Sequence, residues 1–481
     1  MQPSNHVHVP GVRNRDAAAI AFCSLALCTA LVLSSVLAVV LPWGGTAYAE
    51  VLKADIVLGE TVEQRGLTVS QCPNIEAQHA IVIDERGTTY FERDADAPAK
   101  IASITKVMTA VTAIGAAPLE TMVTVSGNAS TIGESSAELY EGDTMTLYEA
   151  LKAMLIPSGN DAAQAISESI GALLLSNEGQ TTDDITACEA RFVAEMNAKS
   201  AALGMTNSLW TNPHGLDDWD FESDQHSTAR DLSILARHAM SIPEIREITA
   251  QDTGSCTVNR GGEQLSIILE STDELLGAYE GAMGIKTGYT DSAGNCFAGA
   301  CARNGIEVYS IVLNSTDEVQ RFTDTTELWD WVFAHTVDYA LCNCPTTTAN
   351  QRGEMVPLAA EVPNEAWFDA TIEATFEDPQ ASVRVFDLSG NISQSVEYRQ
   401  ITGDVHAGDV VGTISFIQHN QIIASANLVA ARDDPAPNIF QAIGIWWTKL
   451  IGRFAGDDGI ADSKLYNQTP LLNDKALQNA A

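Results

Sequence analysis

Three short polar motifs, far apart in the chain, constrain most strongly how this sequence can fold. Ser103-Ile104-Thr105-Lys106 comes first, Ser158-Gly159-Asn160 follows, and Lys286-Thr287-Gly288 comes last. Each is ordinary alone, because serines cap helices, lysines lie on helix surfaces, and Ser-Gly-Asn and Lys-Thr-Gly occur at turns and strand ends. All three in this order are a specific signal of serine-based acyl transfer. The fold must therefore bring these three segments to one place.

The spacing of the first motif suggests a nucleophile and its base. At the start of a helix, Ser103 and Lys106 lie one turn apart, so that the amine can reach the hydroxyl and accept its proton. Lys106 must be neutral to do so, which requires burial and a second nearby cation to depress its pKa. We expect Lys286 to be that cation.

The same arrangement predicts how a tetrahedral oxyanion would be stabilised. The backbone N–H of Ser103 points out of the helix N-terminus, where anions are favoured. A second donor is expected from the strand beside it, in the N–H of Tyr289.

The remaining motif residues are assigned to proton transfer and substrate binding. Ser158 is expected to relay a proton between the lysine and the leaving group, and Asn160 to bind the substrate amide. Lys286 and Thr287, followed by Gly288, are expected to hold a terminal carboxylate of the substrate. These groups suffice for acyl transfer, so neither a cofactor nor a metal is implied.

Hydrophobic periodicity predicts an α/β (α+β) fold in which a helical insertion interrupts one mixed antiparallel sheet. Alternating residues after residue 351 predict a small all-β domain at 352–432, following a catalytic domain at 74–348. The predicted elements of the larger domain are a hairpin (Ala80 to Ile83, Thr89 to Glu92), a helix (Ile101 to Ile114), a mostly helical stretch (Leu147 to Met240), three strands (Met283 to Thr287, Cys296 to Ala302, Glu307 to Leu313) joined by a turn at 303–305, and a closing helix (Thr323 to Tyr339).

Segments near both ends of the chain have sequence patterns that indicate export or membrane contact. Residues 1–49 read as an export signal, with basic residues, an apolar run and Ala47-Tyr48-Ala49 as the cleavage site, although the run is also long enough for a retained anchor. An amphipathic helix is predicted at 438–455, with aromatic residues on its apolar face, and a disordered tail at 456–481. We therefore expect an extracytoplasmic protein at the membrane surface.

Charge and cysteine content exclude some classes of function. The formal net charge of −37 would repel nucleic acid, and otherwise indicates only a solvated acidic surface. Outside the signal seven cysteines remain, an odd number, and none has metal-site spacing. A bridge between Cys296 and Cys301 is not expected, because they point to opposite faces of one strand. A staple from Cys72 to Cys342 or Cys344 is one possible pairing.

The motifs and their surroundings resemble the low-molecular-mass penicillin-binding proteins that act as serine D-Ala-D-Ala carboxypeptidases. The similar stretches are PAKIASITKVMTA at 98–110, IPSGNDAA at 156–163, NPHGLDD at 212–218, HSTARDL at 226–232 and GIKTGYTDSAG at 284–294, with AGDVVGTISF and ANLVAARD in the later domain.

This resemblance implies an acyl-enzyme on Ser103, removal of the terminal D-alanine from peptidoglycan stem peptides, and inhibition by β-lactams. It also implies that Arg321 binds the terminal carboxylate and that the amphipathic helix lies on the outer face of the cytoplasmic membrane. His214 and His226 fall inside similar stretches and are interpreted as structural. Two departures bear on substrate range: the acidic Asp273-Glu274, and a longer, more acidic segment from Leu173 to Ala190.

Three alternatives remain open from the sequence. A D,D-endopeptidase would use the same groups on cross-links. A class A β-lactamase shares the three motifs, but needs a glutamate that activates water, and it lacks the β-domain and the amphipathic helix. A non-enzymatic wall-binding protein would be expected to have lost motif residues, yet all three motifs are intact.

Overall fold

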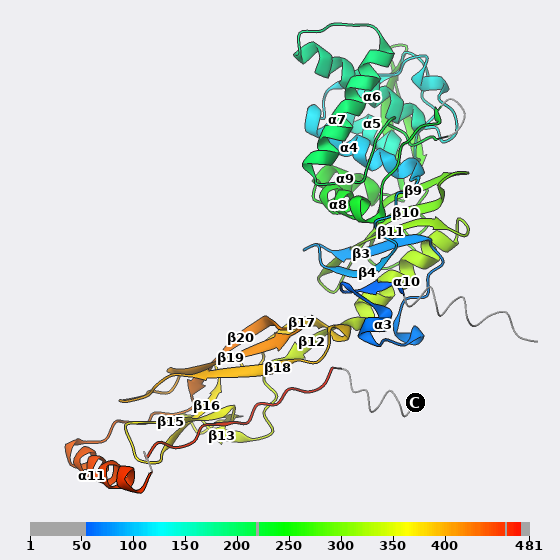
Figure 1. Cartoon of the computed structure of the whole chain (residues 1–481). Helices are drawn as coiled ribbons and strands as arrows, with labels where there is room; N and C mark the ends of the chain where they lie inside the picture. Colours follow the sequence, from blue (N-terminus) through cyan, green and yellow to red (C-terminus); the bar gives the residue numbers. More distant parts are fainter. Residues whose placement is uncertain (1–53, 218–220, 457–458, 473–481) are drawn as a thin grey trace, which may run out of the picture. The chain divides into compact units, whose positions relative to one another are not determined.

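The computed structural model describes residues 54–217, 221–456 and 459–472 (Figure 1). The chain falls into two compact units, of which the first ends at Cys72 and the second begins at Pro73. In the first unit a hairpin of β1 (Ile56–Val57) and β2 (Glu60–Thr61) leads into the short helix α3 (Val62–Arg65), and the 3-10 turn η1 follows at 69–71. The export signal predicted at 1–49 lies outside the described residues.

The main sheet of the second unit confirms the predicted fold class. Its strands run in the order β4-β3-β11-β10-β9, and each neighbouring pair is antiparallel. Asn304 and Gly305 form the predicted tight turn, with φ angles of 53° and 71°. The strands are β3 (His79–Asp84), β4 (Thr89–Arg93), β9 (Ala282–Thr290), β10 (Gly294–Arg303) and β11 (Ile306–Ser315).

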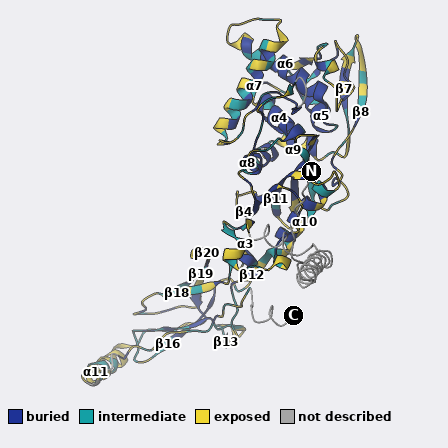
Figure 2. Ribbon diagram, turned by 45° about the vertical axis from the view of Figure 1, so that its right-hand side comes forward, coloured by how far each residue is buried: buried dark blue, intermediate teal, exposed yellow. Residues whose placement is uncertain are grey.

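The helices come from the long insertion between β4 and β9, as predicted, and they bury one face of this sheet (Figure 2). Ile81 and Ile311 belong to the same buried cluster as the helices. Their neighbours Val82 and Val312 are also buried, and because side chains alternate along a strand they face the other side. The helical elements are η2 (Ala102–Ile104), α4 (Thr105–Ala116), η3 (Ala129–Thr131), α5 (Leu147–Leu155), α6 (Asn160–Asn177), α7 (Ile185–Ala202), α8 (Ala229–Met240) and α9 (Pro243–Thr249).

A second sheet, of order β5-β6-β7-β8, was not predicted. One face of its hairpin is buried through Cys256, Val258 and Leu269, whereas Ile268 on the other face is exposed. Thr and Ser separate the few apolar residues of β7, and in β8 the exposed Ile268 interrupts the alternation of Leu265, Ile267 and Leu269. They are β5 (Met122–Thr124), β6 (Thr144–Thr146), β7 (Thr253–Arg260) and β8 (Glu263–Glu270).

The closing helix of the larger region ends earlier than predicted. Helix α10 covers Gln320–His335, not Thr323 to Tyr339. The next residues, Thr336–Ala340, form β12, which pairs with β17 (Ser382–Phe386). Tyr339 packs in the apolar core of the later β region. Strand pairing with β17 there outweighs the helical periodicity of residues 336–339. We propose that this region begins near Thr336.

The later region is all-β, as predicted, and centres on a sheet of order β18-β19-β20-β16-β15-β21. Its core includes Ile372, Ile414, Phe416 and Leu428. Its other strands are β13 (Thr347–Ala349), β14 (Met355–Pro357), β15 (Ala360–Pro363), β16 (Thr371–Phe376), β18 (Ser393–Tyr398), β19 (Val410–Gln418) and β20 (Gln421–Ala430), and the 3-10 turn η5 lies at 387–389.

The predicted amphipathic helix is present, but the prediction of a disordered tail after it is wrong for residues 459–472. Helix α11 covers Ile439–Ala455. The chain then returns, and β21 (Lys464–Leu465) pairs with β15. Asn467 is buried and bonds to Leu341 O, Asn343 N and Gln394. Strand pairing and these polar contacts order a segment whose composition alone suggests disorder.

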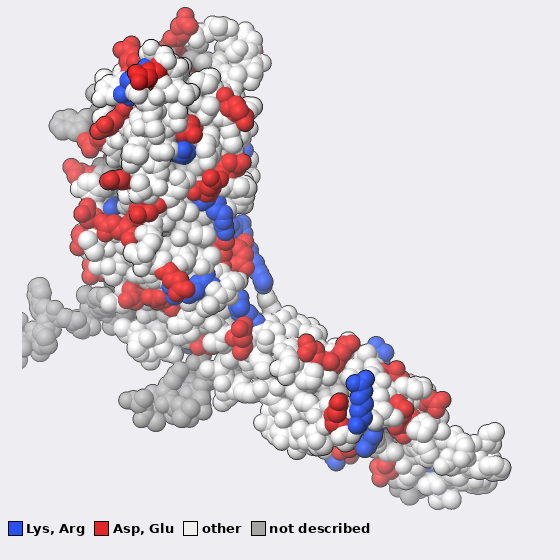
Figure 3. All heavy atoms as spheres, turned by 180° about the vertical axis from the view of Figure 1, so that it is seen from behind, with Lys and Arg blue, Asp and Glu red and all other residues white. Residues whose placement is uncertain are grey.

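Large apolar side chains on α11 are exposed. Phe440 and Phe454 are each 87% exposed, and Trp446 and Trp447 are more than half exposed. Figure 3 shows acidic side chains spread over the visible face of the protein, whereas the end that contains α11 is mostly uncharged. Among the described helices, none combines the length and apolarity that crossing a membrane requires.

The seven cysteines of the described residues are all free thiols. Cys296 and Cys301 are not bridged, in agreement with the prediction. The structure does not contain the suggested disulfide between Cys72 and Cys342 or Cys344. Burial raises the pKa of Cys296 to about 12, as expected for an inert core thiol.

Candidate active site

The first motif forms a tight turn at the start of α4. Ser103 lies in η2, directly before the helix, and Ala102 adopts a left-handed conformation with φ 48°. Gly215 packs against this turn so closely that a Cβ atom there would lie 1.9 Å from Ala102 O. A strained residue beside the nucleophile, held in place by a glycine-specific contact, is typical of a preorganised site.

Lys106 points back along the helix to Ser103. Its Nζ lies 2.7 Å from Ser103 Oγ, 2.6 Å from Asn160 Oδ1 and 3.0 Å from the backbone oxygen of His214. The side chain is fully buried. Burial holds the pKa of Lys106 well below its usual range, Lys286 lowers it further, and Asp161 opposes the shift. These are the two causes predicted from the sequence.

The second motif connects this lysine to the facing loop. Asn160 begins α6 and donates through Nδ2 to Gly133 O at 3.0 Å and through its backbone N–H to Ser135 O at 2.8 Å. Ser158 is buried and left-handed, with φ 65°. Asp161 accepts from the backbone N–H groups of residues 137 and 139 and from the Ser136 hydroxyl. The loop at 133–139 is therefore fixed by α6.

The third motif lies on β9, beside the nucleophile. A Cβ atom at Gly288 would lie 3.2 Å from Ser103 N, so a glycine lets the strand approach the turn. Thr287 Oγ1 is 2.5 Å from Thr272 Oγ1. Lys286 is buried, and its Nζ donates to Thr287 O at 3.1 Å. Burial and Arg321 lower the pKa of Lys286 to about 7, while Asp273 opposes this shift.

Arg321 reaches β9 from α10. Its Nη1 donates to Gly288 O at 3.4 Å, and its guanidinium lies 4.9 Å from the centre of the Phe322 ring. The side chain of Tyr289 is exposed and donates from its hydroxyl to Asp291 at 3.0 Å. The backbone of Tyr289 continues the strand past Gly288, where the second oxyanion donor was predicted.

Asp273, which marks a departure from the recognised pattern, is buried next to these cations. Its Oδ1 accepts from Leu275 N at 2.9 Å. Burial raises the pKa of Asp273 to about 6, although the Leu275 hydrogen bond, Lys286 and Arg321 oppose the rise. Asp273 does not line the cavity, but its charge acts on Lys286 and Arg321.

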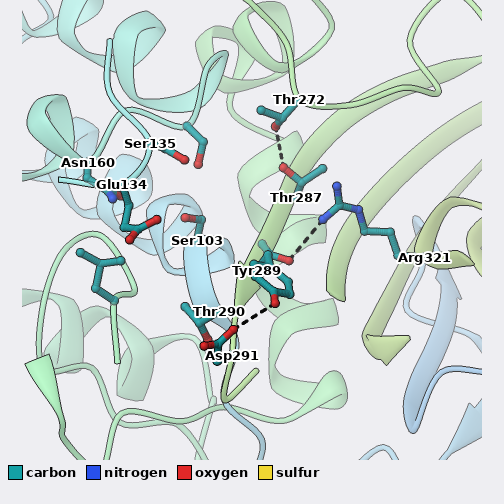
Figure 4. Close-up of a pocket in the computed structure, with 13 residues that line it drawn as sticks. Ser103, Glu134, Ser135, Asn160, Thr272, Thr287, Tyr289, Thr290, Asp291 and Arg321 are labelled. Carbon is teal, nitrogen blue, oxygen red and sulfur yellow. Dashed lines mark hydrogen bonds between the residues drawn. The ribbon is translucent and has the colours of Figure 1, made fainter. Parts of the chain in front are cut away.

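These groups converge on one cavity of about 280 Å³ (Figure 4). Of the predicted residues, Ser103, Ser158, Asn160, Thr287, Gly288, Tyr289 and Arg321 line it, while Lys106 and Lys286 lie buried behind its wall. The other lining residues, which were not predicted as site residues, are Glu134, Ser135, Leu216, Thr272, Thr290 and Asp291. Leu216, Thr290 and Asp291 lie within the similar stretches at 212–218 and 284–294, whereas no quoted stretch contains Glu134, Ser135 or Thr272.

Both histidines contact backbone groups of nearby loops, and a structural role remains the prediction for them. His214 is buried, and burial together with Lys106 lowers its pKa to about 3. Its Nδ1 accepts from Leu216 N at 3.1 Å, which holds the loop whose backbone oxygen contacts Lys106. His226 bonds through Nδ1 to Asp224 O at 2.5 Å. Within the described residues no group of His, Cys, Asp and Glu is arranged to hold a metal ion.

Comparison with known proteins points the same way as this geometry. The family model described as D-alanyl-D-alanine carboxypeptidase matches residues 66–317. A D-alanyl-D-alanine carboxypeptidase from Mycobacterium tuberculosis is 35% identical over 269 residues, which cover 54% of this chain and 84% of that protein. Another from Bacillus subtilis is 25% identical over 370 residues, covering 75% and 86%.

A solved structure agrees in fold. The crystal structure of a Streptomyces DD-transpeptidase superposes with a TM-score of 0.50 and 28% sequence identity, and covers 55% of this chain and 98% of its own. The match to the family model covers the segments that carry all three motifs.

Proposed function

This chain belongs to the D-alanyl-D-alanine carboxypeptidase family, and we propose that Ser103 is the nucleophile with which it removes the terminal D-alanine from peptidoglycan stem peptides. The observation that carries this assignment is the 2.7 Å contact between the Ser103 hydroxyl and a fully buried lysine. Burial favours the neutral amine, and a neutral amine can accept the proton of the attacking hydroxyl.

The first step forms an acyl-enzyme. Lys106 takes the Ser103 proton as the hydroxyl attacks the carbonyl carbon between the two D-alanines. The backbone N–H groups of Ser103 and Tyr289 receive the developing oxyanion. Ser158 passes the proton to the nitrogen of the departing D-alanine. Asn160 uses its second Nδ2 hydrogen for the substrate amide, because its Oδ1 already accepts from Lys106.

The second step hydrolyses the ester on Ser103. Water attacks the acyl carbon, Lys106 again accepts the proton, and the serine returns to its starting state. β-Lactams present a reactive amide to the same hydroxyl, so they acylate Ser103 as well. A metal or cofactor has no role in this sequence of steps.

Recognition of the terminal carboxylate is assigned to one wall of the cavity. Thr287 offers a hydroxyl, and Arg321 and Lys286 supply positive charge from α10 and β9. The guanidinium stays charged at every working pH, whereas Lys286, with a pKa of about 7, loses charge as the pH rises. Binding of the carboxylate therefore favours the protonated lysine.

Acylation by a fluorescent penicillin tests the assignment of the nucleophile. We expect label on the peptide that contains Ser103, and none on Ser103→Ala or after denaturation. Product analysis on purified cell wall separates the two peptidase activities: free D-alanine supports the carboxypeptidase, whereas shortened cross-links without D-alanine would support a D,D-endopeptidase.

The proposed location, outside the cytoplasm and at the membrane surface, rests on residues 1–49 and on helix α11. Export through residues 1–49 would place the catalytic region outside the cytoplasm, where stem peptides are found. Helix α11 would lie on the outer face of the cytoplasmic membrane, because it exposes Phe440, Trp446, Trp447 and Phe454 and carries only basic charges, Lys449 and Arg453.

A further inference from the structure

One carboxylate in the catalytic cavity has no role in the mechanism above. Glu134 lines the cavity and is exposed to solvent. In Figure 4 its carboxylate points to the space in front of Ser103, across the cavity from Arg321. Among the described residues, the Glu134 side chain has no hydrogen-bond or ion-pair partner.

The backbone holds Glu134 in this position. Asn160 bonds to the carbonyl oxygens on both sides of it, Gly133 O at 3.0 Å and Ser135 O at 2.8 Å. Glu134 is left-handed, with φ 57°, a conformation that costs a non-glycine residue about 1 to 3 kcal/mol. A motif residue of the active site thus fixes the backbone from which this carboxylate extends.

We infer that Glu134 is a specificity-determining residue that binds a free, positively charged amine on the stem peptide. This inference rests on the proposed function. Arg321 and Lys286 attract the carboxylate at the end of the peptide, while Glu134 provides an opposite charge on the facing wall. A peptide that carries an ammonium group on the side chain before the two D-alanines would match both charges.

Two synthetic peptides test this inference on the full-length enzyme. One is Nα-acetyl-L-Lys-D-Ala-D-Ala, with a free ε-amine, and the other carries an acetyl group on that amine as well. We expect Glu134→Gln to lower kcat/KM for the free-amine peptide by about two- to fivefold relative to the diacetyl peptide, the range of an exposed ion pair. Added salt should reduce the preference of the wild type in the same way.

Glu138 provides the matched control. It lies on the same loop, is exposed and left-handed with φ 58°, but does not line the cavity. Glu138→Gln should leave the ratio of the two peptides unchanged. An unchanged ratio in Glu134→Gln would overturn the inference, and so would an equal loss on both peptides, because that pattern marks a role in the reaction itself. Failure of the wild type to release D-alanine from either peptide would refute the proposed function instead.

A separate observation concerns two cysteines in the later β region. The Sγ atoms of Cys342 and Cys344 are 3.8 Å apart, and both residues are partly exposed. The five other cysteines of the described residues are buried. Asn467 fixes the turn between them by accepting from Asn343 N at 2.7 Å and donating to Leu341 O at 3.0 Å. The geometry points to a reversible disulfide between Cys342 and Cys344.

The oxidant would be a small-molecule disulfide. Burial and Cys342 raise the pKa of Cys344 to about 12. Attack of Cys342 on the oxidant forms a mixed disulfide and releases one small thiol. Cys344 then displaces the second thiol and closes the protein disulfide. Two hydrogens and two electrons pass to the oxidant, which leaves as two thiols.

Alkylation and mass spectrometry test the pair in full-length protein equilibrated with reduced and oxidised glutathione. We expect Cys342 and Cys344 to lose their reactivity toward the alkylating reagent together, with a mass lower by two hydrogens. Cys344→Ser should instead retain glutathione on Cys342, while Cys188→Ser, at a buried thiol, should behave as wild type. Independent alkylation of both thiols at every glutathione ratio, or stable glutathione adducts on both, would contradict the inference. D-alanine release is measured in parallel and is expected to stay the same.

Discussion

Lys106 is suited to act as a base because its surroundings penalise its charged form. It has no direct carboxylate contact; its partners are the Ser103 hydroxyl, an amide oxygen and a backbone oxygen. Lys286 adds repulsion, and Asp161 offsets only part of it. The same side chain on a helix surface would be charged and without catalytic use.

Replacing Lys106 by arginine tests this argument, because a guanidinium keeps the charge but does not lose its proton. We expect D-alanine release and penicillin acylation to fall by about a hundredfold to ten-thousandfold, the usual contribution of a general base. Steady-state kinetics and acylation rates measure the effect. Lys152→Arg, at an ion pair with Glu149 on α5, serves as the control and should retain activity.

The pH profile depends on Lys286 and Asp273. Carboxylate binding needs protonated Lys286, so kcat/KM should fall as the pH rises through about 7. Asp273 raises the pKa of Lys286, and its removal therefore lowers that pKa further. Asp273→Asn should shift the alkaline limb of the profile to lower pH, while Asp183→Asn on an exposed loop should not. A limb that stays in place or moves to higher pH would show that Lys286 does not govern it.

At the scale of elements, the site depends on close contacts between η2, β9 and the loop that carries Gly215. Gly215 and Gly204 both have positive φ, 94° and 82°, but only Gly215 lacks space for a side chain. The backbone of the nucleophile turn is thus positioned by a neighbour that is distant in sequence.

A pair of alanine variants separates the cost of a left-handed backbone conformation from the cost of a steric overlap at the nucleophile turn. Gly204→Ala should cost about 1 kcal/mol, from its left-handed conformation alone. Gly215→Ala should cost about 1 to 3 kcal/mol more, because its Cβ would overlap Ala102 O, and it should also slow acylation of Ser103. Denaturant unfolding and penicillin acylation measure both. Equal stability and equal acylation of the two variants would mean that the contact at Gly215 does not position the turn.

The elements also show where sequence reasoning succeeded and failed. The motif order and the periodicity of 80–114 and 283–313 predicted the hairpin, the nucleophile helix and the three late strands, because apolar patterns there match the observed burial. Strands β7 and β8 were missed, since β7 has few apolar residues and the exposed Ile268 interrupts the alternation in β8. Glu134 was missed because only the hydrogen bonds of Asn160 place it in the cavity.

At the scale of the whole molecule, the later region holds α11 at both ends. The chain enters α11 after the backbone pairing of Val405 with Asp434, and it returns to pair β21 with β15. The returning segment was predicted to be disordered, because neither the strand pairing nor the burial of Asn467 is visible in sequence. Tethering at both ends fixes an exposed apolar helix to a folded support.

Vesicle binding tests the proposed role of α11. Phe440→Ser with Phe454→Ser removes two aromatic side chains that are 87% exposed, so folding should be unaffected. Binding to vesicles that contain phosphatidylglycerol should weaken at least tenfold, since each buried phenyl group contributes about 1.5 to 3 kcal/mol. Ile422→Ser, at an exposed residue of β20, is the control. Undiminished binding of the double variant would exclude α11 as the contact.

The central claim is that this chain is a carboxypeptidase whose nucleophile is Ser103. The most direct measurement is D-alanine release from diacetyl-L-Lys-D-Ala-D-Ala by the wild type and by Ser103→Ala, with folding of both verified by circular dichroism. We predict release by the wild type and none above background by the variant. Release that persists in Ser103→Ala, or its absence from a wild type that is still acylated by penicillin, would contradict the account.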